Sequence, residues 1–240
     1  MARIVKEEEY AARRNEILDA TQRLVYAKGY EQMSVQDILD ALHISKGAFY
    51  HYFASKAEAL DSLVERMVVE EVVPLLEPMV ENPRLSAIQK LHAYFDTGLR
   101  WKSGRKAFML QLLRVWLSDE NAIVRLKLMN MTIEHITPLL VEIIRQGKRE
   151  GVFTTMYPEQ TCQIIIYTLM GLSNSIIELL ISDESERNAA QVKQTVSEYS
   201  NALNDTTERL LGAPPGSMHL IDLDMLEGWF PVPQSIPERA

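Results

Sequence analysis

A short stretch near the N-terminus carries side chains suited to contacting a nucleic acid. Residues 34–53 read SVQDILDALHISKGAFYHYF. In a helix over residues 46–53, Phe49, Tyr52 and Phe53 share one side and can pack inward. The opposite side then presents Lys46, Gly47, Tyr50 and His51. A cation, a bare backbone, a phenol and an imidazole can contact phosphates and base edges in a DNA major groove, so this side predicts DNA contact.

Four short helices are expected to position this stretch. Apolar residues recur at helical spacing in each, and a serine precedes the second, third and fourth, where it can accept a hydrogen bond from the first turn. The expected helices cover about residues 8–28, from Ser34 to Leu42, from Ser45 to about Phe53, and from Ser55 until Pro74 ends the fourth. The second and third helices, joined by a short turn, have the layout of a helix-turn-helix.

The order and spacing of these residues resemble one known family. The stretch from Gly29 to Leu60 is similar to the N-terminal DNA-binding domain of the TetR family of transcriptional regulators. The matching residues are Gly29, Ser34 (where the family usually has Thr), Ile38, Ala41, Ser45-Lys46-Gly47, Tyr50-His51-Tyr52-Phe53 and Ser55-Lys56. At two positions the chain departs from the pattern. His43 stands where Gly is usual, which costs strain if the backbone there is left-handed, and Ala48 stands where Thr is frequent.

Chemistry and the resemblance together predict eight DNA-binding residues. They are Ser34, Ser45, Lys46, Gly47, Ala48, Tyr50, His51 and Lys56. The two serines leave backbone N–H groups at helix N-termini for phosphate oxygens, and Tyr50 and Lys56 can also reach the backbone. Each serine would also cap a helix in any protein, and Tyr50 could simply cover the edge of a core. DNA contact is therefore argued from the whole set.

Residues of the third helix are expected to contact base edges and so to determine which DNA sequence is bound. Lys46 and His51 carry the hydrogen-bonding groups, and Gly47 allows the backbone to approach closely. Ala48 has no hydroxyl, but its methyl can lie against a thymine methyl.

The charge distribution permits a DNA partner despite an acidic chain. The 240 residues carry a net charge of −8. Residues 1–56 hold equal numbers of basic and acidic side chains, so the whole deficit lies in the remainder. A single cysteine, Cys162, and the lack of an apolar signal segment at the start predict a cytoplasmic protein. Residues 162–182 are long enough to span a membrane but include Glu178, and a helix buried inside protein explains them better.

Longer helices follow, and no strand pattern is evident, so we expect an all-α fold. The expected helices cover about residues 84–98, 104–117, 119–146 (kinked or split at Thr137 by Pro138, and ended by Gly147 and Gly151), 158–182 and 187–211. The predicted organisation is a helix-turn-helix domain over 1–54, a helical effector-binding and dimerisation domain over 55–212 that begins with a linking helix at 55–73, and a tail over 213–240 packed on the body.

The second domain is expected to dimerise and to bind a small molecule. The helix over 158–182 is apolar nearly all round and must be covered on two sides. A second copy would cover one side, in agreement with the family pattern; a monomer covered by its own tail is the alternative. The middle helices resemble the family's effector-sensing region, and the candidate effector-binding residues are His92, Trp116, His135 and Tyr167. A His or Trp on an apolar helix face is also compatible with a simple core position.

Catalytic and metal-binding motifs are missing from the sequence. It contains no HExxH, GxSxG, P-loop or GxGxxG pattern, so neither an enzyme nor a cofactor is expected. The alternative is an all-helical metabolic enzyme or lipid-binding module with a fortuitous helix-turn-helix-like start. The preferred interpretation is a homodimeric repressor that binds a palindromic operator and is released by an effector. Activation in place of repression stays open.

Overall fold

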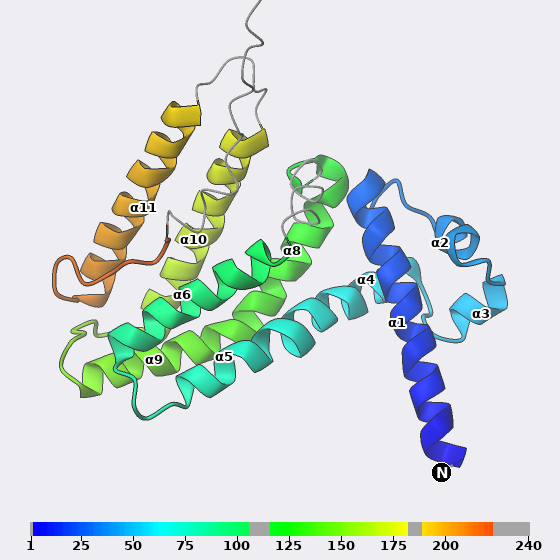
Figure 1. Cartoon of the computed structure of the whole chain (residues 1–240), viewed down its shortest axis with the longest axis horizontal. Helices are drawn as coiled ribbons and strands as arrows, with labels where there is room; N and C mark the ends of the chain where they lie inside the picture. The colour runs from blue at the N-terminus through cyan, green and yellow to red at the C-terminus, as the bar shows by residue number, and fades with distance from the viewer. Residues whose placement is uncertain (1, 106–115, 182–188, 223–240) are drawn as a thin grey trace, which may run out of the picture. The chain divides into compact units, whose positions relative to one another are not determined.

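The computed structural model describes residues 2–105, 116–181 and 189–222. Every regular element in these ranges is a helix (Figure 1), which confirms the predicted all-α fold. The elements are α1 (Ala2–Lys28), α2 (Val35–Leu42), α3 (Lys46–Tyr50), α4 (Lys56–Glu65), the π-helix η1 (Arg66–Val72), α5 (Val73–Val80), α6 (Ala87–Ser103), the 3₁₀ turn η2 (Asp119–Asn121), α8 (Ala122–Met131), the π-helix η3 (Thr132–Ile136), α9 (Thr137–Arg149), α10 (Pro158–Ile181) and α11 (Ala189–Leu211). Most of the helix expected over 104–117 lies outside the described residues.

The chain packs as two compact units. The first unit comprises residues 1–74 and 107–135, and the second comprises 75–106 and 136–240. In the first unit α1 packs against α2 and α4, and α4 also packs against α8. The division by packing therefore differs from the division at residue 54 expected from the sequence, because α4 and α8 both belong to the unit that holds α3.

The core of the first unit fixes the positions of the short helices. Ile17 and Leu18 of α1 are fully buried, as is Leu60 of α4. Helix α3 ends at Tyr50 rather than near Phe53 as expected. Phe49 of α3 is fully buried, and Phe53, three residues beyond the end of α3, is 1% exposed. A helix of five residues is too short to be stable alone, so these two rings hold α3 on α1 and α2.

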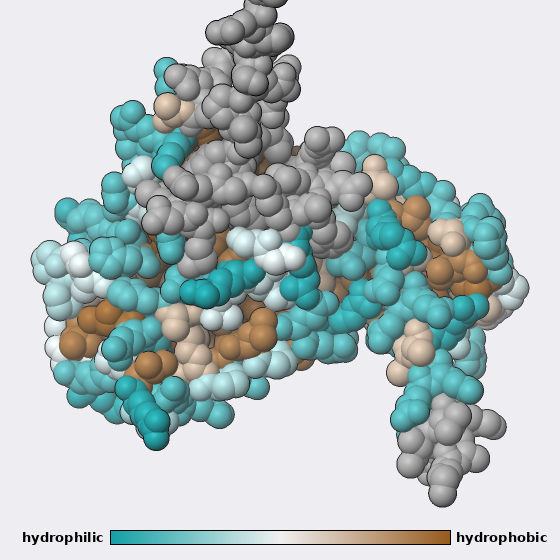
Figure 2. Space-filling view, viewed as in Figure 1, coloured by the Kyte–Doolittle hydropathy of each residue, from teal (hydrophilic) through white to brown (hydrophobic). Residues whose placement is uncertain are grey.

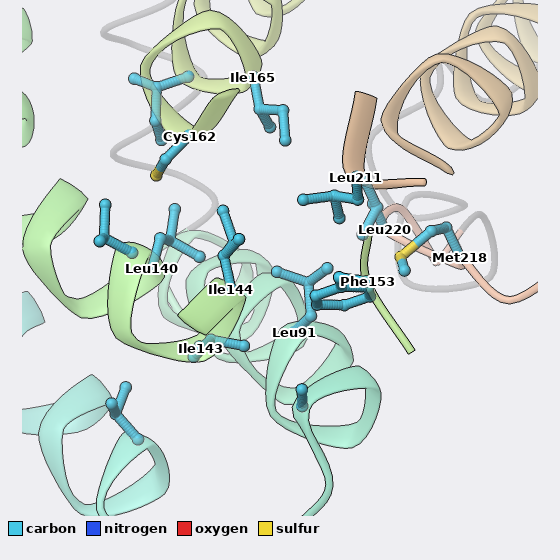
Figure 3. Packing of buried hydrophobic residues seen from close by; sticks show 14 of the residues in the cluster. Leu91, Leu140, Ile143, Ile144, Phe153, Cys162, Ile165, Leu211, Met218 and Leu220 are labelled. Atoms are coloured by element: carbon cyan, nitrogen blue, oxygen red, sulfur yellow. The ribbon is translucent and has the colours of Figure 1, made fainter. Parts of the chain in front are cut away.

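The core of the second unit lies among α6, α9, α10, α11 and the segment that follows α11. Figure 3 shows Leu140 and Ile144 of α9 pointing toward Cys162 and Ile165 of α10. Side chains beyond α11 complete this core near Phe153 and Leu211; they are Met218 and Leu220, both almost fully buried. The rest of the predicted tail, residues 223–240, lies outside the described residues.

Proline and glycine account for two differences from the expected helix ends. Pro74 was expected to end the fourth helix, but η1 continues α4 into α5, and Pro74 takes the second position of α5, where a missing N–H costs little. Gly147 lies inside α9 rather than at its end. The ring of Phe153 packs where a side chain on this residue would be, which explains the presence of a glycine. Before Pro138 the helical residues also continue without a gap, and the π-helix η3, which ends at Ile136, gives way to α9 at Thr137, the residue at which the kink or split was expected.

Helix α10 is long and apolar enough to cross a membrane by length and composition alone. Its most apolar window has a mean hydropathy of 1.3, and only 17% of that window is buried. The sequence predicts a helix buried inside the protein, whereas most of this window is exposed in the single chain. One such helix is weak evidence for a membrane. On the face of the molecule shown in Figure 2, hydrophobic residues appear in separate patches among hydrophilic ones.

Candidate nucleic-acid interface

A capping box fixes the start of α2. The Oγ of Ser34 accepts a hydrogen bond from the backbone N–H of Asp37 at 3.2 Å, and the Asp37 carboxylate accepts from the Ser34 backbone N–H at 2.7 Å. Lys28, in the last turn of α1, pairs with the other Asp37 oxygen at 2.6 Å. The ammonium of Lys28 and the two Ser34 donors hold the pKa of Asp37 well below its ordinary value. The start of α2 is thereby tied to the end of α1.

The turn between α2 and α3 has a left-handed residue. His43 has φ 52° and ψ 43°, and its backbone N–H donates to the carbonyl of Leu39, which ends α2. It is the one residue other than glycine with positive φ among those described. The strain expected from the sequence at this position is therefore present, at a cost of about 1–2 kcal/mol.

The two faces of α3 separate as the sequence predicts. Ser45 caps the helix, its Oγ accepting from the backbone N–H of Ala48 at 3.1 Å. Ala48 is partly buried, and the buried ring of Phe49 meets that of Tyr50 edge-on, with centroids 5.4 Å apart. The exposed residues of this segment are Ser45, Lys46, Gly47, Tyr50 and His51. The exposed set therefore presents one cation, one imidazole and one phenol to the solvent.

Gly47 has no steric role inside the protein. A Cβ built on it lies 3.9 Å from the Oγ of Ser45, an ordinary van der Waals distance, and its φ is not in the left-handed region. The fold would therefore accept a side chain here. A glycine that the fold does not require is consistent with close approach by another molecule.

Lys56 is engaged inside the first unit. Its Nζ donates to the carbonyl oxygens of Tyr30 at 3.0 Å and Met33 at 2.9 Å, and it lies 4.1 Å from the centroid of the Tyr30 ring. Two of the three ammonium donors therefore hold the loop between α1 and α2. This geometry indicates that Lys56 positions the loop first and has at most one donor left for a phosphate.

The same loop is held from its other side by η2. The backbone N–H of Tyr30 donates to Oδ1 of Asn121 at 2.9 Å, and that of Glu31 donates to the carbonyl of Glu120 at 3.1 Å. Asn121 is fully buried. Gly29, with φ 82°, brings the loop so close that a Cβ on it would lie 2.7 Å from Cβ of Glu120. These contacts were not anticipated, because nothing in the sequence pairs residues 90 positions apart.

An aromatic side chain of α1 also reaches the exposed face of α3. The ring centroid of Tyr10 lies 5.7 Å from that of His51, edge-on at 77°, and 4.7 Å from that of Tyr52. One turn further along α1, the guanidinium of Arg14 lies 5.3 Å from the Phe53 ring centroid. Sequence reasoning missed Tyr10. The available signal was the i, i+4 spacing of Tyr10 and Arg14, which continues the buried face of α1 toward its N-terminus.

The four candidate effector-binding residues are divided between the two units. Trp116 and His135 belong to the first unit, and His92 and Tyr167 to the second. Tyr167 is 46% exposed on α10, beside Ile164 at 50%, so it lies on an outer face rather than in the apolar interior. His135 is partly buried, with Nε2 3.9 Å from a carboxylate oxygen of Glu134.

His92 and Trp116 have partners within their own units. The Nε2 of His92 lies 2.9 Å from the carbonyl oxygen of Ser217, to which it donates, and thus holds the segment after α11. Arg125 donates to the carbonyl of Trp116 and, at 2.9 Å, to that of Ser118. An effector role for the four residues stays a prediction. Among the described residues, no group of three or more His, Cys, Asp or Glu could hold a metal ion.

Two family models match the chain. Residues 17–63 match the model described as bacterial regulatory proteins, tetR family, and residues 114–186 match the model of the tetracyclin repressor-like C-terminal domain. The first match contains all of α2 and α3 and begins seven residues after Tyr10. The second covers η2, α8, η3, α9 and all of α10.

Curated relatives and solved structures agree with these matches. The chain is 23% identical to the HTH-type transcriptional repressor DhaR of Mycobacterium sp. strain GP1 over 82% of this chain and 95% of the relative. It is 46% identical to an HTH-type transcriptional regulator in the lacX 3′ region of Lactococcus lactis subsp. lactis over 55 residues. These 55 residues are 23% of this chain and 28% of the relative. The fold is similar to that of the fatty acid degradation regulator FadR from Bacillus halodurans, with a TM-score of 0.58 at 21% identity over 83% of this chain and 95% of that one. Reduced Escherichia coli NemR gives a TM-score of 0.56 at 20% identity over 84% of this chain and 99% of that one.

Proposed function

The chain belongs to the TetR family of bacterial transcriptional regulators, and on that premise we propose that it is a repressor that binds a palindromic operator as a homodimer. A small-molecule effector bound in the helical part releases it from the operator. The protein works in the cytoplasm, where the DNA is, and we assign it no catalytic activity and no cofactor.

The exposed side of α3 carries this proposal. Its buried side is fully accounted for by Phe49 and Phe53, whereas the exposed side places Lys46 and His51 next to a glycine that the fold does not need. In a major groove the lysine and the imidazole would donate to base edges, and Gly47 would let the backbone approach. Tyr50 and the two capping serines, Ser34 and Ser45, would contact phosphates and set the register. Ala48 would make an apolar contact. Lys56 would act mainly through the loop that it holds.

The outer face of α10 supports the homodimer. Ile164 and Tyr167 on α10 and Tyr199 on α11 are large, apolar and exposed, and α10 and α11 lie side by side (Figure 1). Such a face on a regulator is best covered by the same face of a second copy, which gives twofold symmetry. A twofold dimer presents two copies of α3 to a DNA site whose two halves are related by the same symmetry.

Release by an effector requires a state with lower operator affinity. An effector that binds only when the two copies of α3 no longer match the half-site spacing would shift the population to that state. The contacts of Asn121 and Glu120 with the loop before α2 support this idea, because they join the C-terminal family-model segment to the DNA-binding helices within one unit.

Salt dependence and one double variant test the proposal. The wild-type chain should bind a selected DNA duplex with log Kd rising against log salt at a slope of about 0.9 per phosphate contacted. Lys46→Ala combined with His51→Ala should remove the preference for that duplex while thermal melting and dimer mass stay unchanged. Lys148→Ala with His219→Ala, two exposed positions in the other unit and away from α3, is the matched control. Equal affinity of the Lys46/His51 double variant and the wild type would overturn the assignment of the site.

A further inference from the structure

Tyr10 has an exposed ring with no role in the core of the first unit. It is 41% exposed, and its two ring neighbours are His51 and Tyr52, at the end of α3. His51 and Tyr52 also meet each other edge-on, with centroids 5.0 Å apart at 83°. The three rings form a closed cluster, which we call the Tyr10 cluster, on the edge of the proposed DNA-binding face. Tyr10 precedes residues 17–63, the segment that the family model matches, so the match itself assigns this residue no role.

The cluster restricts the imidazole of His51. An exposed histidine at the end of a short helix would otherwise sample several rotamers, and each immobilised side chain that makes an interface contact loses conformational freedom on binding. Two edge-on aromatic contacts, one from Tyr10 and one from Tyr52, favour a single ring orientation before DNA is bound. The orientation is set by α1, which is anchored by fully buried Ile17 and Leu18.

We propose that Tyr10 is a specificity-determining residue: its ring holds the His51 imidazole in the orientation that contacts a base, and Tyr10 itself acts as a positioning residue. The inference rests on the proposed function, since it assumes that His51 faces DNA. This positioning role differs from a direct contact between the Tyr10 hydroxyl and a phosphate, because a phosphate contact would add affinity for every DNA sequence.

The test compares Tyr10→Phe and Tyr10→Ala in the full chain. The probes are the duplex that the wild-type chain enriches from a random pool, its single-base-pair variants, and an unrelated duplex of equal length. Tyr10→Phe keeps the ring and should bind like wild type. Tyr10→Ala should bind the enriched duplex about three- to tenfold more weakly, the range expected for one side chain that is no longer pre-oriented. It should bind the unrelated duplex unchanged and keep the wild-type salt slope.

A double-mutant cycle identifies His51 as the residue through which Tyr10 acts. In a His51→Ala background, Tyr10→Ala should cost nothing further, and both single variants should lose discrimination at the same base pair. Without DNA, the ring-proton NMR signals of His51 should shift in Tyr10→Ala and stay near their wild-type positions in Tyr10→Phe. Tyr157→Ala, which removes a tyrosine 64% exposed in the other unit, is the matched control.

Three results would overturn the inference. Additive effects of the two alanine variants would separate Tyr10 from His51. Equal weakening of both Tyr10 variants on all duplexes, with the salt slope reduced by about one unit, would indicate a phosphate contact by the hydroxyl. Wild-type affinity of Tyr10→Ala would leave the ring without a role. If the wild-type chain enriches no duplex at all, the proposed function fails first, and the inference fails with it.

Discussion

Gly47 offers a test in which stability and DNA binding move in opposite directions. Gly47→Ala adds one methyl at the second position of α3. That methyl has 3.9 Å to its nearest non-neighbouring atom, so the fold accepts it without strain. Alanine is better than glycine in a helix by about 0.5–1 kcal/mol. For a chain of this size, that gain raises the melting temperature by about 1–4 °C.

The same methyl should weaken operator binding. Gly47 is exposed and follows Lys46 on the exposed side of α3. A side chain at this position would therefore project toward any DNA in contact with that side of the helix. Forcing a methyl into a packed interface typically costs about 1–3 kcal/mol, which corresponds to an increase in Kd of about fivefold to about a hundredfold. Titration of a fluorescently labelled enriched duplex measures this loss, and a thermal melt of the same samples measures the gain.

Gly98→Ala is the matched control for this prediction. Gly98 lies in α6, and among the described residues no atom outside its own stretch of helix lies within 4 Å of a built Cβ. Its replacement should stabilise the chain by a similar amount and leave DNA affinity unchanged. Wild-type affinity of Gly47→Ala for the duplex would refute the claim that DNA approaches the backbone of α3, and a lower melting temperature would refute the geometry of α3 itself.

Four further predictions concern the framework of the two units. His43→Gly should stabilise the first unit by about 0.5–1 kcal/mol, since relief of the left-handed strain exceeds the added entropy of the unfolded chain; a loss of stability on urea titration would contradict the φ of 52°. Asp37→Asn should cost about 1–2 kcal/mol at pH 7, through the cap and the Lys28 pair. Because folding lowers the pKa of Asp37, this contribution is complete above the unfolded pKa near 4 and is lost as pH falls, so wild type and variant should converge in acid; a gap that stays constant from pH 7 to 3 would refute it. Burial raises the pKa of the Cys162 thiol to about 12, so a thiol reagent at pH 8 should label it only after denaturation, and rapid labelling of the native chain would be the contrary result. Gly147→Ala should lower stability by about 1–3 kcal/mol, since its Cβ would lie 2.0 Å from Cδ2 of Phe153, and an unchanged urea midpoint would show that the ring moves freely.

Signals from neighbouring residues in the sequence were sufficient to predict which side of α3 is buried and which is exposed. The serines before α2 and α3, and the i, i+4 spacing of Phe49 and Phe53, depend only on neighbouring residues, and the structure has them as expected. At His43 the sequence predicts strain if the backbone is left-handed, because the family usually has glycine at this position, and the structure has φ 52° there.

Contacts between segments far apart in the chain could not be predicted from the sequence. Pro74 was expected to end a helix, but a π-helical turn before it places it in the first turn of α5, where no N–H is required. Gly147 was read as a helix end, although its role is to admit the ring of Phe153. The sequence predicts that Lys56 contacts DNA and that His92 contacts an effector, whereas the ammonium of Lys56 and the imidazole of His92 each donate to backbone carbonyls of their own unit. In each case the deciding partner lies elsewhere in the fold, where spacing along the chain gives no information.

The most direct test of the central claim is selection of bound duplexes from random DNA by the purified chain, followed by footprinting of the enriched site. We expect an inverted repeat whose half-sites lie about 10–10.5 base pairs apart, or a multiple of that, with one half-site protected by each subunit. The pattern should be lost when Lys46 and His51 are both replaced by alanine. Enrichment of no sequence, or of a single site without internal symmetry, would contradict it.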